Sequence, residues 1–423
     1  SAYDGDIFND AILRTLPGNS AVGQVLYSTS ERSEEEKLNH AIKDRVQPFK
    51  AHFDFGPLAI THNGNLTNAR TLRRQLLARK RSLQTIDVDT ATALEFIGAA
   101  EGENLVARLK NALPQLEGAY SFILLSPKKL IGVRDPLGIR PLFIGRIGGA
   151  FAFASEDCAL YALGAHGVCE VKPGEIIVVE NGRLASHSFA KPARPRPCIF
   201  EYVYFARPDS TIEGQSVSEV REQLGAELAH EAPAKVDIVV PIPDSGVPAA
   251  NGYARALNLP LKFGVIRNHY PFRTFIDDTE RERDRKVSLK FSINRSVVRG
   301  QSLALIDDSI VRGRTAAWIV KELFNAGASQ VHLRSSSPPW RYDCHWGIDE
   351  KDPLNRVATG SMSDADVCAR VREITGATSV AYLSVKGLYN AIYGCERAEM
   401  PRACDRCFTD LRPTPITDLV SLH

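Results

Sequence analysis

Two adjacent carboxylates end an apolar run late in the chain, and a short polar turn follows them. The run is Leu303–Ile306, the acids are Asp307 and Asp308, and residues 309–315 read Ser-Ile-Val-Arg-Gly-Arg-Thr before a helical pattern begins. Such a run is typical of a buried parallel strand. The N–H groups of the turn and the dipole of the next helix favour a phosphate, and the acid pair favours Mg²⁺ or ribose hydroxyls. The alternative is an ordinary strand-turn-helix corner.

Composition narrows the class of protein. The chain has 423 residues, 44% of them hydrophobic, and a formal net charge of +2. This length allows two or three domains, and the small net charge indicates no nucleic-acid or membrane partner. No run approaches the roughly 20 apolar residues that span a bilayer. The eight cysteines are too sparse for a disulfide scaffold, so we expect a cytoplasmic enzyme.

A Pro-rich, basic segment at 190–197 reads as a linker between two domains. Before it, short strands are expected at 58–61, 119–125, 149–154 and 175–179, with helices at 69–81, 91–99 and 105–112. After it, strands at 236–240, 261–266, 303–306 and 330–335 alternate with helices at 248–256 and 315–326. The pattern predicts an α+β domain over 1–190, a doubly wound α/β domain over 198–390 and an irregular cysteine-containing tail over 391–423.

Two further segments of the second domain suit a polyphosphate. The turn Pro241–Gly246 follows a predicted strand and carries a hydroxyl at Ser245, and a plain βα turn is the alternative. Arg273 opens a stretch of alternating charge at 277–290. An Arg at the base of a mobile loop can close over a polyphosphate and exclude water.

These segments together resemble the glutamine phosphoribosylpyrophosphate (PRPP) amidotransferases. The likeness extends over nearly the whole chain, and its motifs are Phe200–Ser210, Pro243–Gly246, Arg273–Ile276 and Asp307–Thr315. It implies a partial N-terminal-nucleophile glutaminase-like domain followed by a type I phosphoribosyltransferase domain. It also implies formation of 5-phosphoribosylamine and pyrophosphate from PRPP and glutamine or ammonia, the first step of purine synthesis. Purine nucleotide inhibitors and a homo-oligomer are expected as well.

The resemblance assigns roles to residues of the second domain. Asp307 and Asp308 would face the ribose and Mg²⁺, and Ser245 beside Asp244 would help to hold Mg²⁺ and pyrophosphate. Arg273 and Lys290 would belong to the closing loop. The cradle of the 5-phosphate would be Ser309, Ile310, Val311, Arg312, Gly313 and Thr315. The chain departs from the family at 268–272, which reads Asn-His-Tyr-Pro-Phe instead of Asn-Arg-Tyr-Val-Gly.

The spacing Cys404-x-x-Cys407 indicates metal or redox chemistry. Some members of the family hold a [4Fe–4S] cluster, and the resemblance implies the ligands Cys198, Cys344, Cys404 and Cys407. A structural Zn²⁺ is the chemical rival, because four thiolates suit it equally, and four free thiols are the third alternative.

The first domain carries parts of a glutaminase. The segment His62–Asn68 resembles the family's oxyanion-hole motif, with Asn63 and Gly64 as the donors, although Asn-Gly is also a hairpin signal. Asp89 matches the acid that holds the amino group of glutamine. Residues 134–142 and 154–156 also match the family.

Two features of the first domain depart from the family. Relatives begin at a nucleophilic Cys, whereas this sequence begins at Ser1 and matches only from a point inside their domain. Leu26 stands where relatives have the Arg that binds the glutamine carboxylate. We therefore expect ammonia-dependent turnover without glutamine hydrolysis. Two alternatives are a diverged PRPP-dependent transferase with another nucleophile and a non-catalytic PRPP- or nucleotide-binding regulatory subunit.

Overall fold

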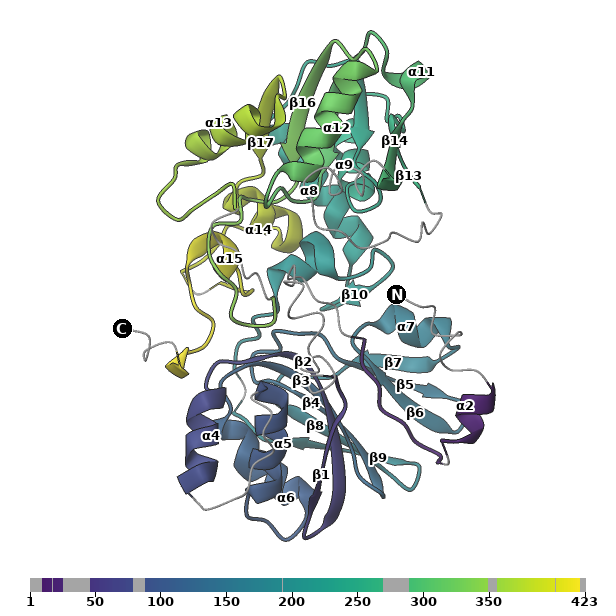
Figure 1. Cartoon of the computed structure of the whole chain (residues 1–423), viewed down its shortest axis with the longest axis vertical. Coiled ribbons are helices and arrows are strands. Elements are labelled where there is room, and N and C mark those ends of the chain that lie inside the picture. The colour runs from purple at the N-terminus through teal and green to yellow at the C-terminus, as the bar shows by residue number, and fades with distance from the viewer. Residues whose placement is uncertain are drawn as a thin grey trace.

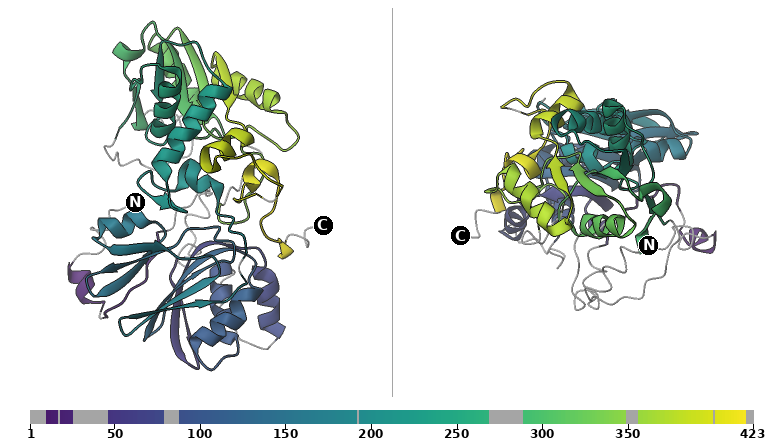
Figure 2. Two further views of the ribbon diagram at one scale, coloured as in Figure 1. Left: turned by 180° about the vertical axis from the view of Figure 1, so that it is seen from behind. Right: turned by 90° about the horizontal axis from the view of Figure 1, so that it is seen from above.

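The computed structural model describes residues 10–16, 18–25, 46–78, 88–191, 193–268, 289–348, 356–399 and 401–418. The elements form two lobes that follow one another along the chain (Figure 1). The view from behind shows the same two lobes, whereas in the view from above they overlap along the long axis (Figure 2). The segment between the last strand of the first lobe and the first helix of the second contains the Pro-rich residues 190–197.

The first lobe is built on a six-stranded antiparallel sheet in the order β1-β2-β3-β4-β8-β9. Its strands are β1 (Phe49–Phe53), β2 (Gly56–Leu66), β3 (Gly118–Leu125), β4 (Lys129–Arg134), β8 (Glu175–Glu180) and β9 (Arg183–Ser188). The helical elements are α2 (Asp10–Arg14), α4 (Ala69–Ala78), α5 (Asp89–Ala99), α6 (Leu105–Ala112) and η2 (Leu113–Gln115). A second sheet consists of β5 (Phe143–Ile147), β6 (Ala150–Ala154) and β7 (His166–Glu170), with α7 (Asp157–Ala162) beside it.

Alternation along β3 explains the layers of the first lobe. Tyr120, Phe122 and Leu124 are fully buried in the core that α4, α5 and α6 share with the sheet. Ile123 points the other way and packs with Leu142 of the core between the two sheets. Successive side chains of a strand face opposite sides, so one strand supplies both cores.

The second lobe has a four-stranded parallel sheet in the order β12-β15-β16-β17. Its strands are β12 (Ile238–Pro241), β15 (Ser302–Asp307), β16 (Gln330–Ser335) and β17 (Ser379–Tyr382). The helices are α8 (Val217–Glu231), α9 (Val247–Leu257), α11 (Arg295–Val298), α12 (Arg314–Asn325), α13 (Asp364–Thr375), α14 (Val385–Tyr393) and α15 (Arg406–Thr409). The remaining elements are η3 (Glu201–Phe205), β10 (Thr211–Ile212), β11 (Gln215–Ser216), β13 (Val265–Arg267) and β14 (Phe291–Ile293).

The central strand β15 is apolar on both faces. Ala304 and Ile306 lie in the core with α8, α9 and α14, whereas Leu303 and Leu305 lie in the core with α12 and α13. Burial on both faces explains why this strand is a continuous apolar run. The predicted order of an α+β domain and then a doubly wound α/β domain is confirmed.

The strand expected at 261–266 is wrong in part. Leu261 makes only an isolated parallel bridge to Val239, and the strand that forms is β13, which pairs antiparallel with β14 outside the main sheet. Pro260 has no N–H to donate to a sheet. Gly264 packs so closely that a Cβ there would lie 2.7 Å from Cγ1 of Val298. The chain therefore leaves the sheet after one bridge.

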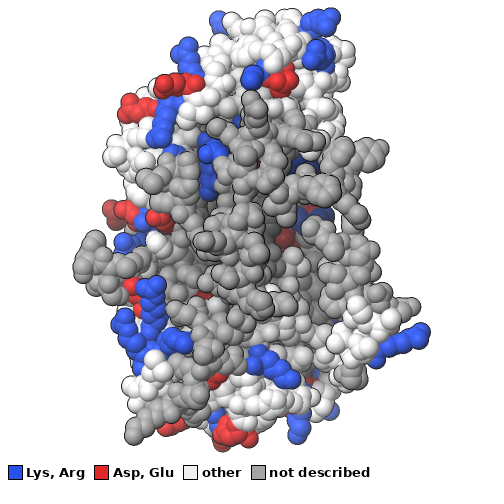
Figure 3. Space-filling view, viewed as in Figure 1, with Lys and Arg blue, Asp and Glu red and all other residues white. Residues whose placement is uncertain are grey.

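The distribution of charged side chains on the surface agrees with the small net charge of the chain. Over the described part of the face that Figure 3 shows, basic and acidic side chains are interspersed. None of the helices in the described ranges is both long enough and apolar enough to cross a membrane.

Candidate active site

The predicted PRPP residues meet at the carboxyl ends of β12 and β15. These strands are parallel neighbours, so the turn after each lies at the same edge of the sheet. The hydroxyl of Ser245 donates to Oδ1 of Asp308 at 2.8 Å. The hydroxyl of Ser309 donates to the other oxygen, Oδ2, at 2.9 Å. Residues 63 positions apart in the chain thus share one carboxylate.

Asp307 is the last residue of β15 and supplies the second carboxylate. Its Oδ1 accepts the N–H of Asp308 at 3.0 Å. Burial, and then the neighbouring Asp308, raise the pKa of Asp307 well above its usual range. A cation relieves such repulsion between carboxylates, and oxygen ligands are those that Mg²⁺ prefers. The acid pair therefore fits a magnesium ion.

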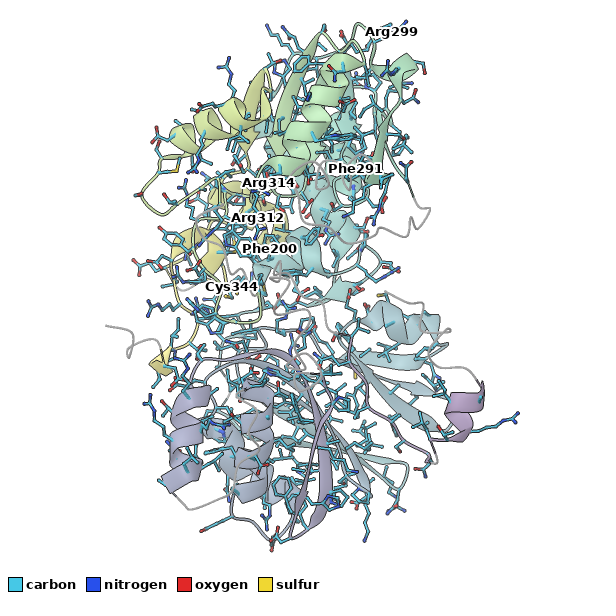
Figure 4. All side chains as sticks on the ribbon, in the orientation of Figure 1. Phe200, Phe291, Arg299, Arg312, Arg314 and Cys344 are labelled. Carbon is cyan, nitrogen blue, oxygen red and sulfur yellow. The ribbon has the colours of Figure 1, made fainter. Side chains whose placement is uncertain are left out.

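The turn after the acid pair leads directly into α12. Gly313 adopts φ 73° at the N-cap, a conformation that glycine tolerates best. The carbonyl of Val311 accepts the N–H of Val357 at 3.0 Å, and that of Ile310 accepts the hydroxyl of Tyr382 at 3.3 Å. The dipole of α12 favours an anion in front of the turn. Arg312 and the exposed Arg314 add positive charge at this helix end (Figure 4).

Within the described ranges, the remaining predicted site residues of the second lobe form no hydrogen bond or ion pair with the acid pair. Asp244 forms an ion pair with Arg267, with Oδ2 and Nη1 2.5 Å apart. Lys290 is exposed, and its carbonyl accepts the N–H of Asn268 at 2.7 Å. Thr315 lies in the first turn of α12. Arg273 lies outside the described residues.

Asn63 and Gly64 lie inside strand β2, so the alternative of a hairpin turn is wrong. They pair with Ser121 and Tyr120 of β3. Gly64 has φ 144°, and a Cβ there would lie 2.1 Å from the carbonyl oxygen of Ala119. The close approach of β3 therefore requires glycine at position 64.

Asp89 lies against the same strand. It is the first residue of α5, and its carboxylate accepts the N–H of Leu66 at 3.1 Å and that of Thr90 at 2.7 Å. Nδ1 of His62 lies 3.3 Å from its Oδ2. Burial acts to raise the pKa of Asp89, but His62 and these hydrogen bonds outweigh it and the pKa is lowered. The structure thus brings the predicted acid to the predicted oxyanion strand.

The four predicted cluster cysteines lie together between the lobes. Cys198 and Cys404 form a parallel backbone bridge. The carbonyl of Cys407 accepts the N–H of Arg341 at 2.8 Å, which ties it to the segment before Cys344. Burial, and then Cys198 and Cys344, raise the pKa of the thiols of Cys404 and Cys407 well above the usual range. Four cysteines from three parts of the chain therefore lie near one another, with Cys198, Cys404 and Cys407 buried and Cys344 partly buried.

The geometry of these thiols bears on the kind of metal. Among the described residues, no three His, Cys, Asp or Glu side chains converge on the position of a single ion. In a [4Fe–4S] cluster each thiolate binds its own iron, so the sulfurs lie farther apart than around one tetrahedral Zn²⁺. Four cysteine side chains have the chemistry that either a [4Fe–4S] cluster or a Zn²⁺ ion requires.

The comparisons with known proteins decide the family. Residues 36–162 match the glutamine amidotransferase domain. The chain is 40% identical over 417 residues to the amidophosphoribosyltransferase of Rhizobium etli, covering 97% of this chain and 81% of the relative. The chain belongs to the amidophosphoribosyltransferase family. It is also 39% identical over 414 residues to the Archaeoglobus fulgidus member, covering 97% and 87% of the two chains.

Solved structures of amidotransferases have the same two-lobe fold. The glutamine PRPP amidotransferase of Bacillus subtilis, complexed with ADP and GMP, superposes with a TM-score of 0.78 at 37% identity. The match covers 88% of this chain and 81% of that one. The family fold therefore holds for both lobes.

Several residues around the predicted oxyanion donors on β2 had no role assigned from the sequence. Nε of Arg140 donates to Oδ1 of Asn63 at 3.1 Å, and Glu201 of the second lobe pairs with the same guanidinium. Arg140 lies in residues 134–142, which match the family in sequence but to which the sequence alone assigned no role. Gly347 packs on Gly64 and had no signal in the sequence. Leu26 and Ser1 lie outside the described residues.

Proposed function

We propose that this protein forms 5-phosphoribosylamine from PRPP, with glutamine or ammonia as the nitrogen donor, as the first step of purine synthesis. This proposal rests on the hydrogen bonds that the hydroxyls of Ser245 and Ser309 donate to the carboxylate of Asp308, beside the turn at 309–315. Family membership supports it, since relatives across the length of the chain are named amidophosphoribosyltransferases.

The second lobe would perform the transfer. The nitrogen lone pair forms a bond to C1 of PRPP while the C1–O bond breaks. Pyrophosphate leaves with the bonding electrons, and the nitrogen loses a proton to solvent. The turn at 309–315 would hold the 5-phosphate and so fix C1, while Asp307 and Asp308 would stabilise positive charge on the ribose. Mg²⁺ bound at Ser245, Asp307 and Asp308 would offset the charge of the pyrophosphate.

Contacts to the leaving pyrophosphate would come from residues around the same edge. Asp244 precedes Ser245 in the turn after β12, and Lys290 precedes β14. We propose that Lys290, together with Arg273, acts in closure over the bound substrate, as in the family.

Where glutamine rather than free ammonia is the donor, the first lobe would supply the nitrogen. The amide of Asn63 and the N–H of Gly64 are the proposed donors to the tetrahedral intermediate of glutamine hydrolysis. Asp89 would bind the amino group of glutamine. Measuring glutamate release from glutamine, with and without PRPP, separates glutamine-dependent from ammonia-dependent turnover.

The acid pair gives the sharpest test of the transfer site. The double variant Asp307→Asn with Asp308→Asn should lose binding of PRPP in the presence of Mg²⁺, measured by calorimetry. The matched control is Asp54→Asn, because Asp54 is an exposed residue of the first lobe, paired with Arg108. Unchanged affinity in the double variant would refute the site.

Two other functions are kept as alternatives. One is a diverged PRPP-dependent transferase with another nucleophile, and the other is a non-catalytic regulatory subunit. Product analysis with ammonia, glutamine and other amines separates them, because only the first alternative yields another product and only the second yields none.

We further propose that Cys198, Cys344, Cys404 and Cys407 hold a structural [4Fe–4S] cluster, which would tie the C-terminal tail to the body of the protein. Burial raises the pKa of Cys198 to about 12, so a free thiolate is disfavoured there and a metal would stabilise it. Since the Bacillus subtilis relative was solved with ADP and GMP, purine nucleotides are also proposed as ligands of this protein.

A further inference from the structure

Arg140 connects the oxyanion strand to the start of the second lobe. Its Nε donates to Oδ1 of Asn63 at 3.1 Å. Its Nη1 lies 3.0 Å from Oε1 of Glu201, the first residue of η3. One side chain therefore contacts both the proposed glutaminase site and a residue from beyond the linker.

The guanidinium is held in a buried position. The side chain of Arg140 is 11% exposed and that of Glu201 is 5% exposed. The Phe205 ring lies under the guanidinium, with the ring centroid 5.3 Å from Cζ of Arg140. Nη1 and Oε1 attract by charge without the alignment of a hydrogen bond. Removing one partner of an ion pair at low exposure leaves a buried charge, so each group restricts where the other can lie.

The orientation of the Asn63 amide decides what it can do. An Asn side chain can present either its oxygen or its NH₂ group in a given direction. Only the NH₂ group can stabilise an oxyanion. Because Nε–H of Arg140 can only donate, Oδ1 must face Arg140 and Nδ2 must face away. The other contact of the amide, from Nδ2 to the hydroxyl of Ser155, is long at 3.4 Å.

We propose that Arg140 is a positioning residue for glutamine hydrolysis. It sets the orientation of the Asn63 amide. Because Glu201 pairs with Arg140 and belongs to the second lobe, that orientation depends on the position of the second lobe relative to the first. This inference rests on the proposed glutamine-dependent function. It adds a physical link between the two half-reactions, because displacement of Glu201 releases the guanidinium that orients the oxyanion donor.

Kinetics of the full-length gene product test the proposal. Arg140→Met should lower kcat for glutamate release by about 10- to 100-fold, because losing an oxyanion donor lowers kcat by about 10²- to 10³-fold. KM for glutamine and ammonia-dependent turnover should stay within about twofold. Arg140→Lys should recover part of the loss, and Glu201→Gln should lose activity in the same direction. An equal fall in both half-reactions, or an unchanged kcat, would overturn the proposal.

A control and a second readout make the result independent of folding and of glutaminase activity. Arg146→Met is the matched control, because Arg146 is exposed and its guanidinium lies over the Phe151 ring, away from Asn63. In an Asn-Gly sequence the backbone nitrogen of Gly64 can attack Cγ of Asn63, release ammonia and form a succinimide, which water opens to an acid.

This deamidation requires the Asn63 side chain to rotate, so mass spectrometry of the peptide should show it faster in Arg140→Met than in Arg146→Met. If the parent protein releases no glutamate, glutamine use fails as a function while the deamidation rates still decide the role of Arg140. Equal rates in the two variants would overturn it.

Discussion

Gly347 lies directly against Gly64. A Cβ atom on Gly347 would come within 3.2 Å of the Cα of Gly64. One residue away, Nδ2 of Asn65 donates to the carbonyl of His345 at 2.8 Å. The segment that follows Cys344 is thus packed on strand β2 of the first lobe.

The contact between these two glycines gives the first prediction. Gly347 has φ 119°, so Gly347→Ala adds backbone strain as well as a tight contact with the backbone of Gly64. We expect a loss of about 1–3 kcal/mol in the free energy of unfolding, and a larger loss of glutamine-dependent than of ammonia-dependent turnover. Denaturation and paired half-reaction assays measure these. Gly376→Ala is the control, because Gly376 has φ 70° with open space around it. Equal effects on both half-reactions would contradict the prediction.

The four cysteines Cys198, Cys344, Cys404 and Cys407 give the second prediction. Protein purified without oxygen should contain about four iron and four sulfide per chain. Cys404→Ser should lower both and speed proteolysis of the tail, because its backbone joins Cys198 and its thiol is buried. Cys158→Ser is the control, since Cys158 is also buried but contacts Ser210. Stoichiometric zinc without sulfide would reject the cluster.

The third prediction concerns a helix cap supplied from the far end of the chain. The carboxylate of Asp418 accepts the N–H of Arg70 at 2.6 Å and that of Thr71 at 3.1 Å, in the first turn of α4. We expect Asp418→Ala to lower the free energy of unfolding by about 1 kcal/mol. Chemical denaturation measures it. Asp418→Asn keeps an acceptor and should lose less; the reverse order would argue against capping.

The fourth prediction is a pH dependence. Burial raises the pKa of Asp135 to about 6, although Arg134 and the N–H groups of Leu137, Tyr120 and Ile139 act in the opposite sense. The folded state therefore binds this proton more tightly than the unfolded state does. The stability that the proton contributes is complete below about pH 4 and is lost as pH rises to about 6.

The free energy of unfolding should fall by up to about 3 kcal/mol from this group across that window. Urea denaturation of the parent and of Asp135→Asn at a series of pH values isolates the effect, because Asn does not titrate. A difference between the two proteins that stays constant from pH 4 to 6 would show that Asp135 does not titrate there.

Local patterns were sufficient for much of the second lobe. The acid pair, the glycine at φ 73° and the start of α12 are consecutive in the chain, so their order alone implies strand, turn and helix. The apolar run of β15 reflects burial on both faces, which leaves a mark in the sequence. Helix α8 was not predicted, although Ser216 caps it and Val217, Val220 and Leu224 mark its buried face.

Only the tertiary structure decided which residues far apart in the sequence contact one another. Asn-Gly at 63 and 64 favours a turn by local preference, but pairing with Tyr120 and Ser121 makes it strand. The placing of Arg140 between Asn63 and Glu201 depends on how the lobes meet. Backbone conformation is largely a property of neighbouring residues, which the sequence lists in order. Contacts between lobes arise from packing and charge pairing between residues far apart in the sequence. No local pattern shows which residue of one lobe will contact which residue of the other.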